Sequence, residues 1–433
     1  MRRSALRARA LAGVVISIAT VFGFAGCGRT NNETTAGGGG DSSIALDNKP
    51  ATGELNLWGI GNEGEKLPEL IRDFEKENPD VHVKVTSIPW TSAHDKFQTA
   101  IAAGTGPDLA QLGSTWMADF ANGLATVPKN LDMSDLAKGA VESGKVAKRQ
   151  VGVPWYVETR VIYYRTDIAK KAGWDHAPGN WDELRAMAKD MQKQEGVKYG
   201  IWLVPTGQDS FLASLPFAFS QGAELTNADG SKWTIDTPEM KKAITYTSNF
   251  FKDKIANVNA DVSPGADMAA FAAGTTPMKL DGPTSIGQIE QIGGPDMKSK
   301  FTTAPLPKGE KGNISFSGGC GMIVFKTSKN KEAAWKLIRW LSKPEVQAKW
   351  YKISTDLPAS QKAWDDPVLK NDDKLAAFST QLKSMKATPS VTTWQQVGSA
   401  GDKIIEQINR GAVSVDEGLS KLQSAADAAG MGK

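Results

Sequence analysis

The sequence predicts an α/β fold built from two lobes. Two observations lead to this prediction. After residue 50 the pattern switches repeatedly between strand and helix signals, and the roughly 380 residues that follow exceed what one hydrophobic core usually supports. Strands that alternate with helices favour a mainly parallel sheet, because the helices serve as crossover connections. No internal repeat is visible in the chain.

The first three strands are expected at the beginning of this region. Residues 54–58 alternate as a strand does, and apolar residues at helical spacing then run from Leu67 to Phe74, with Asn78-Pro79 ending the helix. Residues 81–85 alternate again, and a helix is predicted over 95–103. A break at 104–107 and a short strand at 108–112 complete a β-α-β-α-β order.

Helix signals dominate the later part of the chain. Asn180 is expected to cap one helix, and Ser414 begins a capping box for another. Residues 330–341 carry one apolar face, and the next helix is expected to have Pro344 in its first turn and Glu345 at the capping-box position. We interpret these helices as packing elements.

The first 50 residues have the composition of an export signal followed by a linker. An arginine-rich start and an apolar run lead to small residues just before Cys27, and the run is shorter than the roughly 20 residues of a spanning helix. The pattern predicts a lipoprotein signal peptide over 1–26 and lipidation of Cys27, which would anchor the mature protein to the outer side of the cell membrane. Residues 27–51, rich in Gly, Ser, Thr and Asn, are predicted to be a flexible tether. An ordinary signal peptide is the alternative.

Charge and cysteine content narrow the function further. The formal net charge of +3 becomes −1 once the four arginines of the leader are removed, so no electrostatic case exists for binding nucleic acid. If Cys27 carries lipid, Cys320 has no partner, and we expect it to pack as a small apolar side chain. The three histidines are scattered, so neither a metal site nor a cofactor is predicted.

The unusual feature of the composition is its thirteen tryptophans. Trp58, Trp90, Trp116, Trp155 and Trp394 fall at strand ends, in loops, or beside Pro and Gly, where a large ring has less core to fill. In open α/β sheets ligands bind beyond the carboxyl ends of strands, often where lobes meet. Indole rings there match the C–H face of a pyranose, and neighbouring polar side chains can bind its hydroxyls. This distribution favours a sugar-binding cleft.

Six segments resemble, in the same order, the bacterial extracellular solute-binding proteins of carbohydrate ABC importers, the maltose-binding-type group. They are LNLWGIGNEGEKLPELIRDFEKENPDVHVKV, FQTAIAAGTGPDLAQLGSTWMADFANGLATVP, GVPWYVETRVIYYRTDIAKKAGW, NWDELRAMAKDM, AAFAAGTTPMKLDGPTSIGQI and FSGGCGMIVFKTSKNKEAAWKLIRWLSKPEVQAKW. The resemblance implies a two-lobe periplasmic-binding-protein (type II) fold with three hinge crossings, near residues 161–166, 312–318 and 353–358. Lobe 1 would comprise residues 52–162 and 317–354, and lobe 2 would comprise residues 163–316 and 355–433.

The resemblance also implies which residues contact the ligand. Glu158 matches a carboxylate that contacts sugar, Trp394 matches a stacking position, and two adjacent glycines would let the backbone approach the ligand closely. Gln208 and Phe211 are weaker matches. The implied site residues are Asn62, Glu63, Trp90, Ser114, Thr115, Trp116, Trp155, Glu158, Arg160, Asp209, Asp281, Gly318, Gly319 and Trp394.

The function implied by the resemblance is that of a lipid-anchored receptor. It would capture an oligosaccharide between its lobes without turnover, act as a monomer and deliver the sugar to the transmembrane subunits of an ABC permease. Thr284 stands where the family's best-known member has an aromatic residue, which puts a linear maltodextrin ligand in doubt. Two alternatives stay open. One is an exported glycoside hydrolase with a Trp-lined cleft and carboxylates such as Glu158, and the other is an iron-binding protein that uses Tyr163 and Tyr164.

Overall fold

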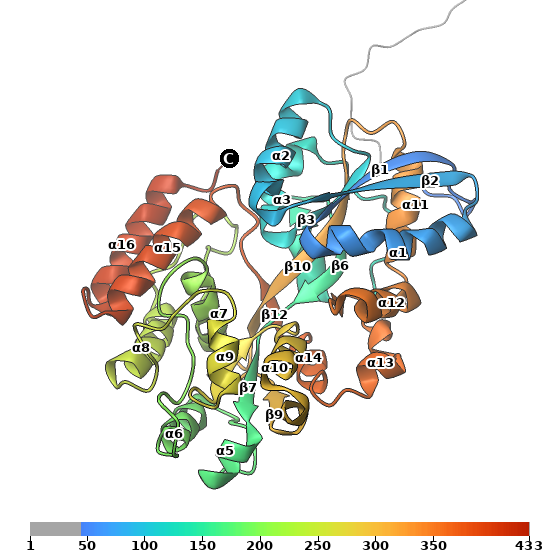
Figure 1. The fold of residues 1–433 in the computed structure, drawn as a ribbon. Helices are drawn as coiled ribbons and strands as arrows, with labels where there is room; N and C mark the ends of the chain where they lie inside the picture. The colour runs from blue at the N-terminus through green and yellow to red at the C-terminus, as the bar shows by residue number, and fades with distance from the viewer. Residues whose placement is uncertain (1–44, 433) are drawn as a thin grey trace, which may run out of the picture. The chain divides into compact units, whose positions relative to one another are not determined.

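The computed structural model describes residues 45–432. The predicted signal peptide over 1–26, the lipidation site Cys27 and most of the predicted tether lie outside the described residues. Within residues 45–432, no helix combines the length and the apolar character that crossing a bilayer requires. Two main sheets with helices around them make up this part of the chain (Figure 1).

The larger sheet has seven strands in the path order β11-β6-β10-β3-β1-β2, with β12 paired to the start of β10. They are β1 (Gly53–Ile60), β2 (Val81–Ile88), β3 (Leu109–Gly113), β6 (Val153–Glu158), β10 (Ser315–Val324), β11 (Leu357–Pro358) and β12 (Met385–Ala387). β1 is parallel to β2 and β3, whereas β10 is antiparallel to β3 and β6. The predicted β-α-β-α-β order is confirmed, but the sheet is mixed, because strands from later parts of the chain join it in the opposite direction.

Helices cover both faces of this sheet (Figure 1). On one face lie α1 (Gly61–Glu77), α11 (Lys331–Leu341) and α12 (Pro344–Ser354), and on the other lie α2 (Trp90–Ala103) and α3 (Met117–Phe120). Successive residues of β10 alternate between the two cores: Met322 and Val324 face α1, and Ile323 faces α2. Because both faces are buried, the central strands are apolar rather than alternating. Cys320 is buried in the first core, as predicted.

A second sheet of three strands holds β7 (Val161–Arg165) between β8 (Met278–Asp281) and β9 (Phe301–Ala304), with antiparallel pairing on both sides. Its helices are α5 (Thr166–Lys171), α6 (Trp181–Gln192), α7 (Ser210–Gln221), α8 (Pro238–Lys252), α9 (Ala266–Ala272), α10 (Ser285–Gly293), α15 (Trp394–Asn409) and α16 (Val415–Ala429). A separate hydrophobic core joins one face of this sheet to α6, α7, α8, α15 and α16. This part of the chain therefore has a core of its own.

Short elements connect these parts of the chain. They are β4 (Lys145–Val146), β5 (Arg149–Gln150), α4 (Lys138–Ser143), α13 (Pro367–Lys370), α14 (Ala376–Gln381), and the 3₁₀ turns η1 (Ser114–Trp116), η2 (Ala121–Gly123), η3 (Pro295–Ser299) and η4 (Lys362–Asp365). The turn η1 follows β3 directly, so it stands at the carboxyl end of a central strand.

Two of the three predicted helix caps are confirmed, whereas α2 begins at Trp90 and not at the predicted residue 95. The side chains of Asn180 and Ser414 each accept a hydrogen bond from the backbone amide three residues later, so α6 and α16 begin with the predicted caps. At the start of α12 no side chain caps the helix. The hydroxyl of Ser342 instead donates to the Ile338 carbonyl at 2.8 Å, so the capping box predicted with Glu345 is wrong.

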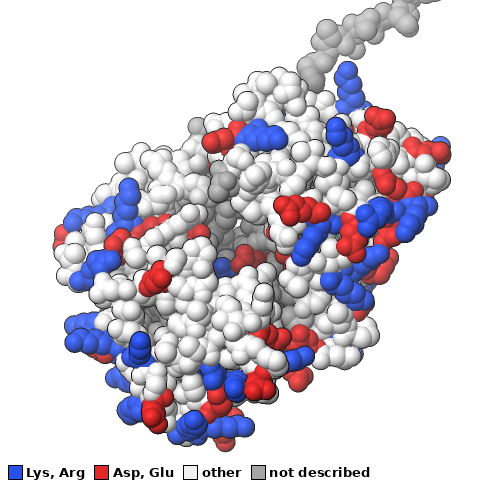
Figure 2. Space-filling view, in the orientation of Figure 1, with Lys and Arg blue, Asp and Glu red and all other residues white. Residues whose placement is uncertain are grey.

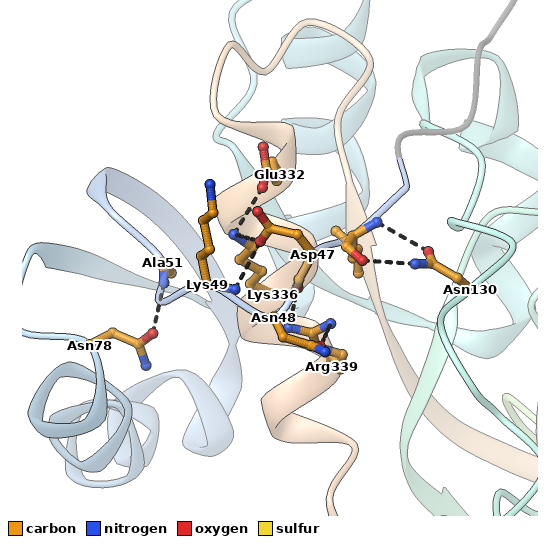
Figure 3. Close-up of polar contacts among 10 residues, drawn as sticks. Asp47, Asn48, Lys49, Ala51, Asn78, Asn130, Glu332, Lys336 and Arg339 are labelled. Atoms are coloured by element: carbon orange, nitrogen blue, oxygen red, sulfur yellow. Dashed lines mark hydrogen bonds and ion pairs between the residues drawn. The ribbon is translucent and has the colours of Figure 1, made fainter.

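Residues 46–51 are bound to the larger sheet and its helices (Figure 3). Leu46 is buried, its amide donates to Asn130 Oδ1 at 3.1 Å, and its carbonyl accepts from Asn130 Nδ2 at 2.8 Å. The carboxylate of Asp47 lies 2.6 Å from the ammonium of Lys336 on α11. The prediction of a flexible tether extending to residue 51 is therefore wrong for these residues, because burial and hydrogen bonds offset the entropy of ordering them.

The connections between the two sheets are short. β6 continues into β7 through residues 159–160, and β10 pairs with β12 over residues 315–317 before it pairs with β6 from Gly318 onward. The lobe boundaries given above stay a prediction. One adjustment follows from the pairing of β11 with β6: residues 357–358 belong to the larger sheet, although the predicted boundary assigns residues 355–433 to lobe 2.

Charged side chains of both signs are mixed over the face drawn in Figure 2. A hollow near the centre of that view contains basic and acidic side chains at its bottom. The visible face thus offers a recess with polar groups inside it, not a surface of one charge.

Candidate ligand-binding cavity

A cavity of about 690 Å³ is lined by elements from both parts of the chain. The larger sheet contributes the start of α2, the turn η1, the end of β6 and the middle of β10. The other part contributes the start of α7 and one side of α15. Small-molecule sites typically have volumes of about 300–1,000 Å³. This cavity has a suitable size for an organic ligand.

Ten of the fourteen predicted site residues line this cavity. They come from six separate stretches of the chain, and the fold alone brings them together. They are Trp90, Ser114, Thr115, Trp116, Glu158, Arg160, Asp209, Gly318, Gly319 and Trp394.

Three indole rings lie on the cavity wall. The rings of Trp90 and Trp116 meet edge to face, with centroids 5.5 Å apart and planes at 68°. Trp90 is 40% exposed, whereas Trp394 is 5% exposed and packs against Trp233 behind it. Trp90 and Trp116 therefore expose ring surface to the cavity, whereas the core holds the ring of Trp394 rigidly at the cavity wall.

Glu158 and Arg160 form an ion pair at the end of β6. The guanidinium of Arg160 also lies 5.1 Å from the ring centroid of Phe316. Burial acts to lower the pKa of Arg160, but the charges of Glu158 and Asp281 outweigh it and hold the pKa above its ordinary value. Arg160 thus stays cationic, and the pair presents adjacent donors and acceptors, which suits the recognition of vicinal hydroxyl groups.

Two glycines of β10 expose their backbone to the cavity, because they have no side chains to cover it. Gly318 and Gly319 pair with Glu158 and Val157 of β6. Gly319 has a φ of 104°, and a Cβ on it would lie 2.3 Å from the Tyr156 carbonyl oxygen. No other residue fits there without moving the neighbouring strand.

Asp209 stands at the start of α7 in a left-handed conformation with a φ of 66°. Its amide donates to a carboxylate oxygen of Asp402 on α15 at 3.1 Å, and Asp402 also accepts from the amide of Phe211 at 2.9 Å. Burial and the charge of Asp402 raise the pKa of Asp209. A non-glycine residue with positive φ costs about 1 kcal/mol or more, and such residues concentrate at binding sites.

Two predicted residues lie in α1 instead of a loop. The helix begins at Gly61, directly after β1, so Asn62 and Glu63 fall in its first turn and do not line the cavity. The carboxylate of Glu63 accepts a hydrogen bond from the hydroxyl of Tyr156 at 2.8 Å. The ring of Trp90, which lines the cavity, lies against this turn, since a Cβ on Gly61 would be 2.5 Å from it.

Trp155 and Asp281 also lie away from this cavity. Trp155 is 1% exposed and stacks on Trp350 with centroids 4.5 Å apart, so its predicted role as a ligand contact is wrong. β6 is buried on both faces, which leaves no ligand-facing position for this ring. Asp281 lies 2.6 Å from the ammonium of the buried Lys279. Burial acts to raise the pKa of Asp281, but the charges of Lys279 and Arg160 outweigh it and lower the pKa.

Several lining residues were missed from the sequence. Ser317 is 1% exposed, and its hydroxyl has no hydrogen-bond partner among residues 45–432. The polar side of α15 adds Gln395, Gly398, Ser399, Asp402, Lys403 and Glu406. These follow Trp394 at steps of four, as 394, 398, 402, 406 and 395, 399, 403, so one face of a helix was the signal available for finding them.

A direct polar contact joins the two walls of the cavity. The amide of Gln395 on α15 lies 3.5 Å from the hydroxyl of Thr115 in η1. The distance is at the limit of a hydrogen bond, so this contact is weak. The two walls are near enough to contact one ligand at the same time.

The family model described as bacterial extracellular solute-binding protein matches residues 59–348. The chain belongs to this family. Among curated proteins, it is 26% identical to the maltotriose-binding protein of Pyrococcus abyssi, over 82% of this chain and 78% of that protein. It is 23% identical to the galactooligosaccharide-binding protein of Bacillus subtilis, over 92% of this chain and 94% of that protein.

Among solved structures, the sugar-binding protein MalE of Xanthomonas citri superposes with a TM-score of 0.82 at 32% identity, covering 87% of this chain and 97% of that one. This likeness confirms the predicted two-lobe α/β fold of periplasmic binding proteins. The relatives and structural neighbours of the chain are binding proteins and not enzymes. Family membership therefore favours binding without turnover over the hydrolase alternative.

The tandem tyrosines do not form a ligand set. Tyr163 and Tyr164 are both buried on β7, with side chains in different cores. The hydroxyl of Tyr163 donates to the Gly282 carbonyl at 2.5 Å. In residues 45–432 no group of three His, Cys, Asp or Glu side chains is arranged to hold a metal ion. The iron-binding alternative has no support in this part of the chain.

Proposed function

We propose that this protein is a lipid-anchored receptor that binds an oligosaccharide in the 690 Å³ cavity and delivers it to the transmembrane subunits of an ABC permease. The ligand would lie between the two walls and be held from both sides. Ligand binding would favour the closed arrangement by its greater affinity for that state. No covalent step is needed.

The observation that carries the proposal is the pairing of ring faces with hydroxyl-binding groups in one cavity. Trp90, Trp116 and Trp394 supply apolar faces, while the Glu158–Arg160 pair supplies charged hydrogen-bond partners. Each sugar hydroxyl that is buried without a partner costs about 1–3 kcal/mol, so rings alone would not suffice. The names of the relatives, which describe binding of maltotriose and galactooligosaccharide, give the same ligand class further support.

The anchoring and the partner rest on the leader sequence and on family membership. Residues 1–26 have the pattern of a lipoprotein signal, Cys27 would carry the lipid, and the protein would act outside the cytoplasm as a monomer. Metabolic labelling with a fatty-acid analogue tests the anchor: label should be incorporated by the full chain and absent from Cys27→Ser.

Calorimetric titration of the mature protein with mono- and oligosaccharides tests the ligand class. At one hundred times its dissociation constant a ligand should stabilise the fold by about 2.7 kcal/mol, which a thermal-shift panel detects easily. Binding of no sugar, together with tight binding of a peptide or a metal, would refute the proposal. Chromatography of the incubated sugars serves as the control, since shortened products would indicate hydrolysis.

A further inference from the structure

A second cavity adjoins the first, among the helices around the smaller sheet. It has a volume of about 190 Å³ and shares five lining residues with the larger cavity: Arg160, Gln208, Asp209, Leu212 and Phe316. We call it the inner chamber. We propose that the inner chamber binds an apolar substituent carried by the sugar, such as an aromatic aglycone. This inference rests on the proposed function and narrows its ligand to glycosides or sugars with an apolar end group.

About half of the residues that line the inner chamber are apolar. α7 contributes Ala213 and Phe217, and the facing elements contribute Phe251, Leu280 and Ile405. A protein cavity of about 150 Å³ is large enough to accept benzene. The inner chamber is slightly larger than that, so one six-membered aromatic ring fits its volume.

The polar groups of the inner chamber are largely engaged within the protein. The hydroxyl of Ser214 donates to the Phe211 carbonyl at 2.6 Å, and that of Thr247 donates to the Ile244 carbonyl at 3.2 Å. The side-chain amide of Asn409 donates to a backbone carbonyl at 3.0 Å. The carboxylates of Asp267 and Asp281, which also line the chamber, pair with the ammonium of Lys279. A bare sugar ring placed there would leave hydroxyls poorly paired, whereas an apolar group needs no hydrogen-bond partner.

Five residues line both cavities, and three of them, Arg160, Gln208 and Asp209, are polar. Asp281 lines the inner chamber next to the buried Lys279. The apolar side chains of Phe217, Phe251 and Ile405 line the inner chamber and not the large cavity. This distribution suits an amphipathic molecule in which a sugar occupies the large cavity and its apolar substituent lies against these side chains in the small one.

Matched pairs of glycosides test the inference on the wild-type protein. For each sugar and anomer, the methyl glycoside and the 4-nitrophenyl glycoside are titrated by calorimetry. For a sugar that binds, the 4-nitrophenyl form should bind about tenfold more tightly or better, as expected for burial of one ring. Equal affinities would overturn the inference and leave the proposed function intact. Failure of every glycoside and free oligosaccharide to bind would overturn both.

A variant that fills the inner chamber tests whether the tighter binding of the 4-nitrophenyl glycoside arises there. Ala213 lines the inner chamber and not the large cavity, so Ala213→Phe should abolish the preference for the 4-nitrophenyl form and leave methyl-glycoside affinity within about twofold. Ala213→Leu is the milder replacement if the phenylalanine variant does not fold. The matched control is Ala269→Phe, which adds the same ring at an exposed position of α9. If the folded Ala213 variants still prefer the 4-nitrophenyl glycoside, the nitrophenyl ring binds elsewhere and the inference is overturned.

Discussion

Replacement of Asp356 by asparagine should stabilise the protein at neutral and alkaline pH. Asp356 follows α12, is 9% exposed, and accepts a hydrogen bond from the indole N–H of Trp350 at 3.0 Å. Burial is the main cause that raises the pKa of Asp356 to about 7, and the neighbouring charge of Glu63 adds to it. Asparagine can keep an acceptor toward Trp350 without carrying the charge.

The sign of the effect follows from proton binding. Between about pH 4 and pH 7 the folded protein holds a proton on Asp356 that the unfolded chain releases, so stability is fully present below this window and is lost as the pH rises through it. One pKa unit corresponds to about 1.4 kcal/mol, so the rise from 3.8 to about 7 corresponds to an upper limit of roughly 4 kcal/mol. Relaxation and water entry reduce this value, and we expect a gain of at least about 1 kcal/mol for Asp356→Asn at pH 8.

Urea unfolding of both proteins at a series of pH values measures the effect. The difference in unfolding free energy between Asp356→Asn and the wild type should be smallest near pH 4.5 and should grow until about pH 8. Asp80→Asn, at an exposed position, is the control and should show no such growth. A difference independent of pH, or a variant that is less stable at pH 8, would show that the buried carboxyl is not the source of the pH dependence.

Four further substitutions have expected outcomes. Trp90→Ala should weaken sugar binding about tenfold, measured by calorimetry, while the melting temperature of the unliganded protein changes by less than about 2 °C. Trp394→Ala should lower the free energy of unfolding by about 3 kcal/mol, measured by thermal melts, because the ring of Trp394 is buried. Ser317→Ala should raise unfolding stability by about 1 kcal/mol and also weaken binding, since its hydroxyl lacks a protein partner within residues 45–432. A drop in both quantities would mean a purely structural role for Ser317. Leu46→Ala should lower the free energy of unfolding in urea by about 2 kcal/mol. An unchanged free energy would show that residue 46 belongs to the tether and not to the folded part.

The tryptophans show how much of the site the sequence can predict. Trp90, Trp116 and Trp394 stand at breaks in the strand and helix patterns, which predicts a place in the site, and all three line the cavity. Trp155 stands at a similar break but lies in the core, stacked on Trp350. Nothing local separates the two cases, because whether a ring at a strand end faces solvent depends on which helix packs over it.

The polar side of α15 illustrates a different limit. The spacing of Ile404, Ile405 and Ile408 predicts the helix itself, but it does not connect the polar face of this helix with the site. Asp402 and Glu406 reach the cavity because α15 packs against α7 and presents that face to the rings of the other wall. A helical pattern says which face is polar, but it does not say whether water or a ligand meets that face.

By itself the sequence determined the local structure and the class of protein. Periodicity placed the first strands and the capped helices, the leader pattern indicated export, and six segments in order indicated the family. Tertiary structure alone decided that β10 and β11 enter the larger sheet antiparallel, that residues 46–51 bind its helices, and that an inner chamber adjoins the site. The physical reason is the separation of the interacting residues along the sequence. Hydrogen bonds within helices and caps join residues a few positions apart. Cavity walls form from side chains up to about 300 positions apart, and their packing depends on the whole core.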